Sequence, residues 1–101
     1  MTSKQRALLR AHANTEDTIL YLGKEGITDS VIKQAWDALE AREIIKVSVQ
    51  RNAPFESTQA ACDALCTRVH AEPVQCIGGK FSIYRRAREK PKLLEMLETR
   101  L

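Results

Sequence analysis

The segment Gly23-Lys24-Glu25-Gly26 has the residue types of an anion-binding loop. Its two glycines permit positive φ and a close backbone approach, because they carry no Cβ. Thr28 is a good N-cap, so the loop leads into a helix start, where unpaired backbone N–H groups favour a negative group. Lys24 adds a positive charge, which Glu25 offsets. The predicted chemistry is phosphate binding, as in the G-x-x-G loops that hold a nucleic-acid backbone.

Cys62, Cys66 and His70 are the side chains whose types suit a metal site or a thiol nucleophile. They stand at i, i+4 and i+8, and residues eight apart on a helix are separated by about 12 Å, too far for one ion to bind all three. No third group orients His70 as a base for a cysteine. We therefore predict cysteines that pack as small apolar side chains, with no metal and no cofactor.

Catalytic motifs are not recognisable in the sequence. Carboxylates occur at helical spacings that suit surface ion pairs, and no pair stands out for acid–base work. The glycine loop matches neither the dinucleotide fingerprint nor the P-loop. We predict that the protein is not an enzyme and has no catalytic residue and no small-molecule substrate.

Basic side chains gather near both ends of the chain. Residues 1–13 hold Lys4, Arg6 and Arg10 with no acid, and residues 80–92 hold six basic side chains and one acidic. Residues 14–79 hold ten acidic and six basic side chains. This distribution predicts a polyanion-binding face if the two ends meet in space. The alternative is a pair of solvated, charged termini.

The hydrophobic periodicity predicts four helices and four strands. The helices are expected at 4–13 (capped by Ser3), 29–42, 58 to about 70 (capped by Ser57) and 91–101, and the strands at 19–22, 44–50, 73–77 and 81–85. The order α-β-α-β-α-β-β-α indicates a two-layer α/β fold with a four-stranded mixed sheet. Strands joined by helices should pair in parallel, and the Gly78-Gly79 hairpin should add an antiparallel strand.

Length and composition are those of one soluble domain covering residues 1–101. No apolar run is long enough to cross a bilayer, and the first twenty residues lack a signal-peptide core. The three cysteines show no C-x-x-C spacing, which indicates reduced thiols. We expect a cytoplasmic protein without a membrane partner.

Tyr84 is an aromatic side chain that could be exposed for stacking on a nucleic-acid base. It alternates with Phe81 and Ile83, so it points to the other strand face, and it stands beside Arg85 and Arg86. A tyrosine half-buried at a sheet face would give the same pattern. Both interpretations are open on the sequence.

Five segments match a known family in order along the chain. They are Lys4-Gln5-Arg6 with Leu9, Leu22 to Thr28, Ala38 to Val47, Val74 to Gly78, and Ile83 to Arg86. In these segments the chain resembles the CRM domain family (chloroplast RNA splicing and ribosome maturation), in particular its stand-alone bacterial YhbY-like members. The resemblance covers residues 3–88 and leaves the tail from residue 90 to 101 as a helical extension.

The resemblance implies a fold like the C-terminal domain of translation initiation factor three. It also implies RNA binding without catalysis, on the structured rRNA of large ribosomal subunit precursors. The family's G-x-x-G contact falls on Gly23, Lys24 and Gly26. Together with the charge pattern, this gives a wider set of predicted RNA-binding residues that also includes Glu25, Thr28, Lys4, Arg6, Arg10, Lys46, Tyr84, Arg85, Arg86 and Arg88.

The tail supports an alternative function. Leu93, Leu94, Leu97 and Leu101 recur at helical spacing, so residues 91–101 could either pack on the core or form an association surface. In the second case the chain would be a protein–protein interaction module, or would self-associate through this helix.

Overall fold

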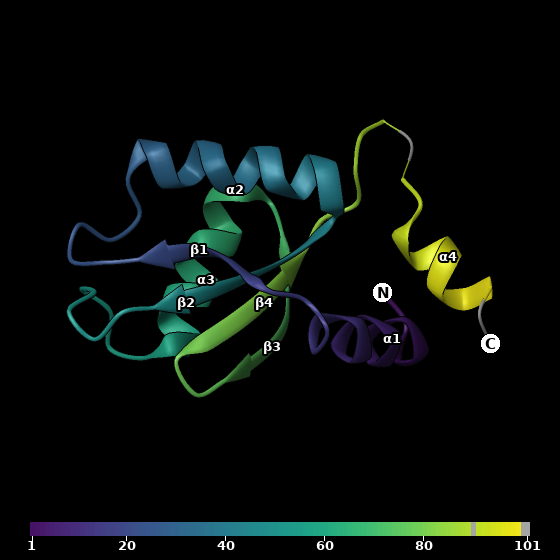
Figure 1. The fold of residues 1–101 in the computed structure, drawn as a ribbon, viewed down its shortest axis with the longest axis horizontal. Helices are drawn as coiled ribbons and strands as arrows, with labels where there is room; N and C mark the ends of the chain where they lie inside the picture. Colours follow the sequence, from purple (N-terminus) through teal and green to yellow (C-terminus); the bar gives the residue numbers. More distant parts are fainter. Residues whose placement is uncertain (90, 100–101) are drawn as a thin grey trace.

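A four-stranded mixed sheet forms the centre of the computed structural model, which describes residues 1–89 and 91–99 (Figure 1). The predicted order of elements is confirmed. The elements are α1 (Ser3–Ala13), β1 (Thr18–Leu22), α2 (Asp29–Arg42), β2 (Ile44–Val49), α3 (Thr58–Val69), β3 (Glu72–Ile77), β4 (Lys80–Tyr84) and α4 (Leu93–Thr99).

The strands lie in the order β1-β2-β4-β3. β1 pairs with β2 in parallel, and β4 pairs antiparallel with both β2 and β3. The prediction that helix-linked strands pair in parallel is therefore wrong for β2 and β3, because the hairpin inserts β4 between them. Pro73 fits an edge strand, since proline has no N–H and in a central strand each N–H is needed by one of the two neighbouring strands.

The main core lies on one face of the sheet, beneath α2 and α3. Alternate strand residues point into it, and the apolar sides of the two helices close it. Its buried members are Leu20, Leu22, Ala35, Leu39, Ile45, Val47, Ala61, Cys62, Leu65, Cys66, Val69, Phe81 and Ile83. The layer of α2 and α3 on the sheet corresponds to the two-layer fold expected from the sequence.

A second, smaller core lies on the opposite face at one end of the sheet. There α1 and α4 lie side by side and cover Ile44, Val74 and Tyr84 (Figure 1). Leu93 and Leu97 of α4 are buried in this core, only 6% and 8% exposed. The alternative of an exposed association surface is therefore wrong for Leu93 and Leu97. Leu101, also part of that prediction, lies outside the described residues.

Local capping sets the helix starts. Thr28 and Ser57 cap α2 and α3 as predicted, each accepting a hydrogen bond from a backbone N–H three residues on. For α1 the predicted cap Ser3 is wrong, because Thr2 and Gln5 form a reciprocal capping box one residue earlier. Among the residues described, no helix has the length and apolarity that a bilayer crossing demands.

Candidate nucleic-acid interface

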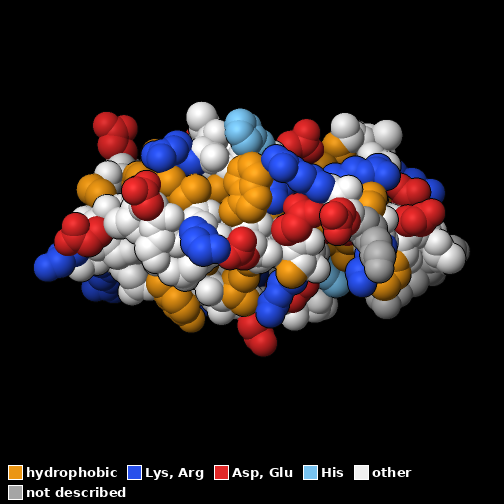
Figure 2. Space-filling view, turned by 90° about the horizontal axis from the view of Figure 1, so that it is seen from above, with side chains coloured by type: hydrophobic (Ala, Val, Ile, Leu, Met, Phe, Trp, Pro, Cys, Tyr) orange, Lys and Arg blue, Asp and Glu red, His pale blue; other side chains and the backbone are white. Residues whose placement is uncertain are grey.

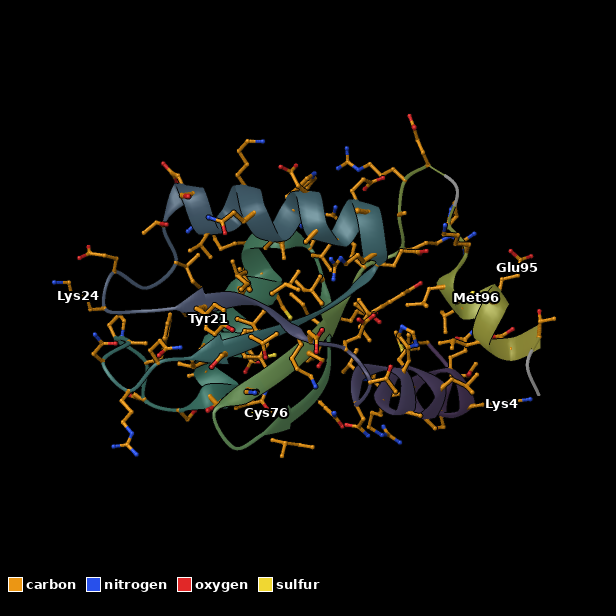
Figure 3. All side chains as sticks on the ribbon, in the orientation of Figure 1. Lys4, Tyr21, Lys24, Cys76, Glu95 and Met96 are labelled. Carbon is orange, nitrogen blue, oxygen red and sulfur yellow. The ribbon has the colours of Figure 1, made fainter. Side chains whose placement is uncertain are left out.

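The glycine loop forms a tight turn at one extremity of the molecule. The Gly26 N–H donates to the Gly23 carbonyl at 2.9 Å, which leaves Lys24 and Glu25 exposed at the tip. Figure 3 shows Lys24 directed away from the body, at the opposite end of the 41 Å long axis from Lys4. The loop and the start of α1 therefore do not form one compact site.

The two glycines of this turn have different reasons to be there. Gly26 has φ of 69°, and a Cβ on it would stand 3.1 Å from Cγ of Pro54. Gly23 has no positive φ, and a Cβ on it would find no atom of the described residues within 4 Å. The backbone conformation and packing therefore favour glycine at position 26, whereas a Cβ at position 23 would meet no steric obstacle in the described residues.

Thr28 joins the loop to α2 by its side chain. Its Oγ1 accepts from the Val31 N–H at 3.1 Å, so the hydroxyl is already engaged in the cap. The N–H groups of Asp29 and Ser30 have no carbonyl partner within the helix and make this end partly positive. The carboxylate of Asp29 reduces that positive field, as Glu25 does in the loop.

Two more turns meet the glycine loop at this end of the sheet. The Gln50 N–H donates to the Leu22 carbonyl at 2.8 Å, and the Val49 N–H donates to the Gly79 carbonyl at 2.8 Å. These contacts bring the exposed side chains of Arg51 and Lys80 to the same end as Lys24. We call this end of the sheet, with the glycine loop, Arg51 and Lys80, the loop end. Sequence reasoning missed Arg51 and Lys80, whose shared position depends on the strand order.

One half of the sheet face opposite the main core lies outside the second core; Tyr21, Ile77 and Lys80 are exposed there, whereas Ser82 is 1% exposed. Register places Tyr21, Ser48, Lys80 and Ile77 in one row across all four strands, and Lys46, Ser82 and Gln75 in the next row. We call these two rows the open half. Tyr21 and Ile77 are 59% and 64% exposed, more than any other large apolar side chain in the described part of the chain.

A shallow cavity of about 180 Å³ lies on the open half, lined partly by Lys46, Ile77 and Lys80. Asn14, just after α1, closes one side of it by accepting a 2.8 Å hydrogen bond from Gln75. Of the predicted RNA-binding residues, the structure therefore puts Lys46 on the open half.

Two predicted residues of α1 lie along the helix that ends at this cavity. Arg10 is exposed one helical turn before Asn14. Arg6 lies one turn earlier, with one guanidinium N–H donating to the Pro73 carbonyl at 2.8 Å. Basic side chains thus continue from the open half along α1.

The prediction that Arg85 contacts RNA is corrected by its position. Its guanidinium lies 4.0 Å from the centroid of the Trp36 ring and donates to the Val69 carbonyl at 3.0 Å and to Glu40 at 3.3 Å. Burial lowers the pKa of Arg85, and the Glu40 carboxylate opposes that shift. The side chain is 11% exposed and ties α2, α3 and β4 together. Arg86 and Arg88, by contrast, are exposed.

The prediction that Tyr84 could stack on a base is also corrected. Its strand face was predicted rightly, but α1 and α4 cover that part of the face, so the residue is 7% exposed. Burial, followed by the charge of Glu43, raises the pKa of its hydroxyl. Tyr84 is a core residue of the second cluster.

Glu43 is a structural residue that sequence reasoning missed. It ends α2 with φ of 67° and is 3% exposed. Its carboxylate accepts from the N–H groups of Ala87, Lys92 and Leu93 at 2.8 to 3.0 Å. Burial alone would raise the pKa of Glu43, but these hydrogen bonds and the charge of Arg86 hold it below its usual value. No local pattern distinguishes it from a surface glutamate.

Cys62 and Cys66 differ from His70 in their surroundings. Cys62 and Cys66 lie in the main core, and their mutual hydrogen bond, with burial, raises the pKa of the Cys62 thiol. His70 is exposed and packs edge-on against Trp36, with ring centroids 6.1 Å apart. Among residues 1–89 and 91–99, no three potential ligands converge on one point.

The face formed by α2 differs in charge from the loop end. Figure 2 shows this face from above, with acidic and basic side chains interspersed over the helix. The ion pair between Lys33 and Asp37 at 3.0 Å is one example. Alternating charges of this kind create no sustained positive field for a polyanion.

Comparison with known proteins places these features in a family. The sequence model of the CRS1 / YhbY (CRM) domain family matches residues 1–85 of the chain. The chain is 38% identical to "Probable RNA-binding protein YqeI" of Bacillus subtilis, over 92% of this chain and 96% of the relative. It is 32% identical to an "RNA-binding protein" of Haemophilus influenzae, over 88% and 89%.

A solved structure gives the same result for the fold. The solution structure of the hypothetical protein SAV1595 from Staphylococcus aureus, described as a candidate RNA-binding protein, superposes with a TM-score of 0.76. The two chains are 39% identical, and the match covers 92% of this chain and 96% of the other.

Proposed function

Because this chain belongs to the CRS1 / YhbY (CRM) domain family, we propose that it binds RNA and catalyses no reaction. The names of its relatives support the RNA partner. We further propose that it acts in ribosome assembly, on structured rRNA of the large-subunit precursor. This narrower role rests on the segments shared with the family, above all the Gly23-Lys24-Glu25-Gly26 loop.

One observation carries the proposal for the loop. Gly23 is a glycine that neither backbone conformation nor packing requires within the described chain. A residue without Cβ in such a place allows the backbone of another molecule to come close. RNA phosphate fits this place, because Lys24 and the start of α2 supply positive charge beside it.

The remaining contacts follow basic side chains that are exposed or, for Lys46, half-buried. Lys24, Arg51 and Lys80 surround the loop end, and Lys46 and Arg10 continue along the open half and α1. Such contacts hold the phosphate backbone without reading sequence. Lys4, Arg86 and Arg88 are exposed at a distance from Lys24, and we expect them to contact only RNA long enough to reach them.

The loop is tested by replacing Gly23 with alanine and measuring affinity for a transcribed fragment of large-subunit rRNA. We expect Gly23→Ala to fold normally and to bind this RNA less tightly than the wild type. Lys24→Ala should lower the slope of log affinity against log salt by about one unit. Lys33→Ala, which removes a lysine of the mixed α2 face, is the matched control and should leave the slope unchanged.

A folded Gly23→Ala protein with wild-type affinity would contradict the role of the loop. If the wild type binds no RNA even at low salt, the proposed function itself is wrong. For the role in ribosome assembly, the tagged protein should sediment with precursors of the large subunit in a cell lysate. Sedimentation with no ribosomal particle would contradict that role.

A further inference from the structure

We infer that the open half of the sheet binds a single-stranded segment of RNA, with Tyr21 stacking on an unpaired base and Lys46 and Lys80 pairing with its phosphates. This inference rests on the proposed RNA-binding function. It adds a second surface to the glycine loop, which would hold the backbone of the neighbouring RNA. The occupant is defined by its chemistry: unpaired bases on a charged backbone.

One row of the open half combines apolar and charged side chains. Tyr21 on β1 and Ile77 on β3 stand at the two edges of the sheet, and Ser48 and Lys80 lie between them. Four strands span about 14 Å from the first to the last. The row therefore offers two exposed apolar surfaces with a polar and cationic centre.

Tyr21 and Ile77 are unusually exposed for their side-chain types. At 59% and 64% exposed, they leave apolar surface in water at a cost in free energy, at the two edges of the same row. Tyr21 alternates with the buried residues Leu20 and Leu22, so its orientation is fixed by the strand. A base stacked on its ring would cover the apolar surface that the fold leaves open.

The open half is complementary in charge to an RNA backbone. The cavity on the open half is lined by Asn14, Lys46, Gln75, Ile77, Lys80, Phe81 and Ser82, and this set, all within the described residues, contains two lysines and no carboxylate. Phosphate groups that follow the bases would find both lysines within the same cavity. An acidic protein partner would pair with the two lysines, but it would not account for the exposed ring of Tyr21.

The shape of the surface favours unpaired over paired RNA. In a double helix the faces of the bases are stacked on one another and cannot reach a tyrosine ring, whereas single strands present them. Sheet surfaces that stack unpaired bases on aromatic side chains are an established mode of RNA binding. The loop end borders this surface, because Tyr21 precedes Gly23 by two residues.

The test uses the full chain and a fluorescent single-stranded RNA of about ten nucleotides, a length within the range such surfaces hold. Tyr21→Ala should weaken binding about tenfold or more, whereas Tyr21→Phe should retain near wild-type affinity, because the ring is what stacks. Lys80→Ala should lower the salt slope by about one unit. Met96→Ala, which removes an exposed side chain of α4, is the control and should have no effect.

A transcribed, structured rRNA fragment separates this inference from the proposed function. If Tyr21→Ala binds the single strand as tightly as the wild type while both proteins bind the structured RNA, the inference is wrong and the proposed function stands. Equal losses for Tyr21→Ala and Tyr21→Phe would also overturn stacking. If the wild type binds neither RNA, both proposals fail.

Discussion

Tyr21 and Tyr84 lie on the same face of the same sheet and have opposite surroundings. Tyr84 is 7% exposed beneath α1 and α4, whereas Tyr21 is 59% exposed beside the glycine loop. We call the part of this face around Ile44, Val74 and Tyr84 the covered half. Its side chains bury apolar surface, whereas Tyr21, Ile77 and Lys80 of the open half are exposed.

The two regions differ in what their charged side chains contact: in one they make hydrogen bonds within the fold, and in the other they face solvent. Beside the covered half, the Glu43 carboxylate turns inward and holds the backbone that leads to α4. Arg85 turns toward the helices of the main core and ties α2, α3 and the end of β4 together. At the loop end and on the open half, the side chains of Lys24, Lys80 and Lys46 make no hydrogen bond or ion pair among the described residues. Substitutions should therefore separate into losses of stability and losses of RNA affinity.

The largest expected effect is on stability, from Glu43→Ala. This change leaves the N–H groups of Ala87, Lys92 and Leu93 without their acceptor in a buried place. We expect a decrease of about 4 kcal/mol in the free energy of unfolding, measured by urea denaturation. Glu95→Ala, an exposed acid of α4, is the control and should change it by less than about 0.5 kcal/mol. A loss as small as that of the control would contradict the role of Glu43.

The next effect separates two adjacent arginines. Arg85→Ala should lower the free energy of unfolding by about 2 to 3 kcal/mol, because it removes the stacking on Trp36 and the hydrogen bond to the Val69 carbonyl. Arg86→Ala, at an exposed position, should change stability by less than about 0.5 kcal/mol. Thermal and urea unfolding of both variants measure this. Equal stabilities would show that Arg85 does not tie the elements together.

A smaller effect separates the two glycines of the loop. Gly26→Ala should lower the free energy of unfolding by about 1 to 2 kcal/mol, because alanine is strained at φ of 69° and its Cβ would press on Pro54. Gly23→Ala should leave stability unchanged or raise it by about 0.5 kcal/mol, since alanine restricts the unfolded chain. Denaturation curves compare the two. If Gly23→Ala were the more destabilising change, the RNA argument built on that glycine would fail.

The smallest effect is on the pH dependence of the covered half. The pKa of Glu43 is lowered on folding, so its stabilising contribution is complete above its usual value of 4.5 and is lost as the pH falls through the lower folded value. The urea midpoint of the wild type should therefore drop more steeply below pH 4.5 than that of Glu43→Gln. Parallel curves for the two proteins would contradict this assignment.

The sequence predicted the elements well, because local patterns determine them. The alternation of Ile44 to Val49 and the cap Thr28 specify a strand and a helix start without help from distant residues. The insertion of β4 between β2 and β3 was missed, since pairing depends on distant contacts. The edge position of Pro73 was the available signal.

The candidate site was less predictable, because burial is decided by tertiary packing. Nothing near Tyr84 and Arg85 in the sequence shows that α1, α4 and Trp36 cover them, and the same basic surroundings suggested an exposed site. Conversely, Tyr21 stands in an apolar run that predicts a buried strand. Its exposure depends on tertiary packing, because α1 and α4 cover the part of this face around Ile44, Val74 and Tyr84 instead.

The most direct test of the account is a map of amide chemical-shift changes when RNA is titrated into the isotope-labelled protein. We predict the largest changes at Tyr21, Lys24, Ser48 and Lys80, which belong to the loop end and the open half. Ile44, Tyr84 and Leu97, in the covered half and α4, should change little. Changes concentrated on the covered half and α4, with the loop end unaffected, would contradict the account.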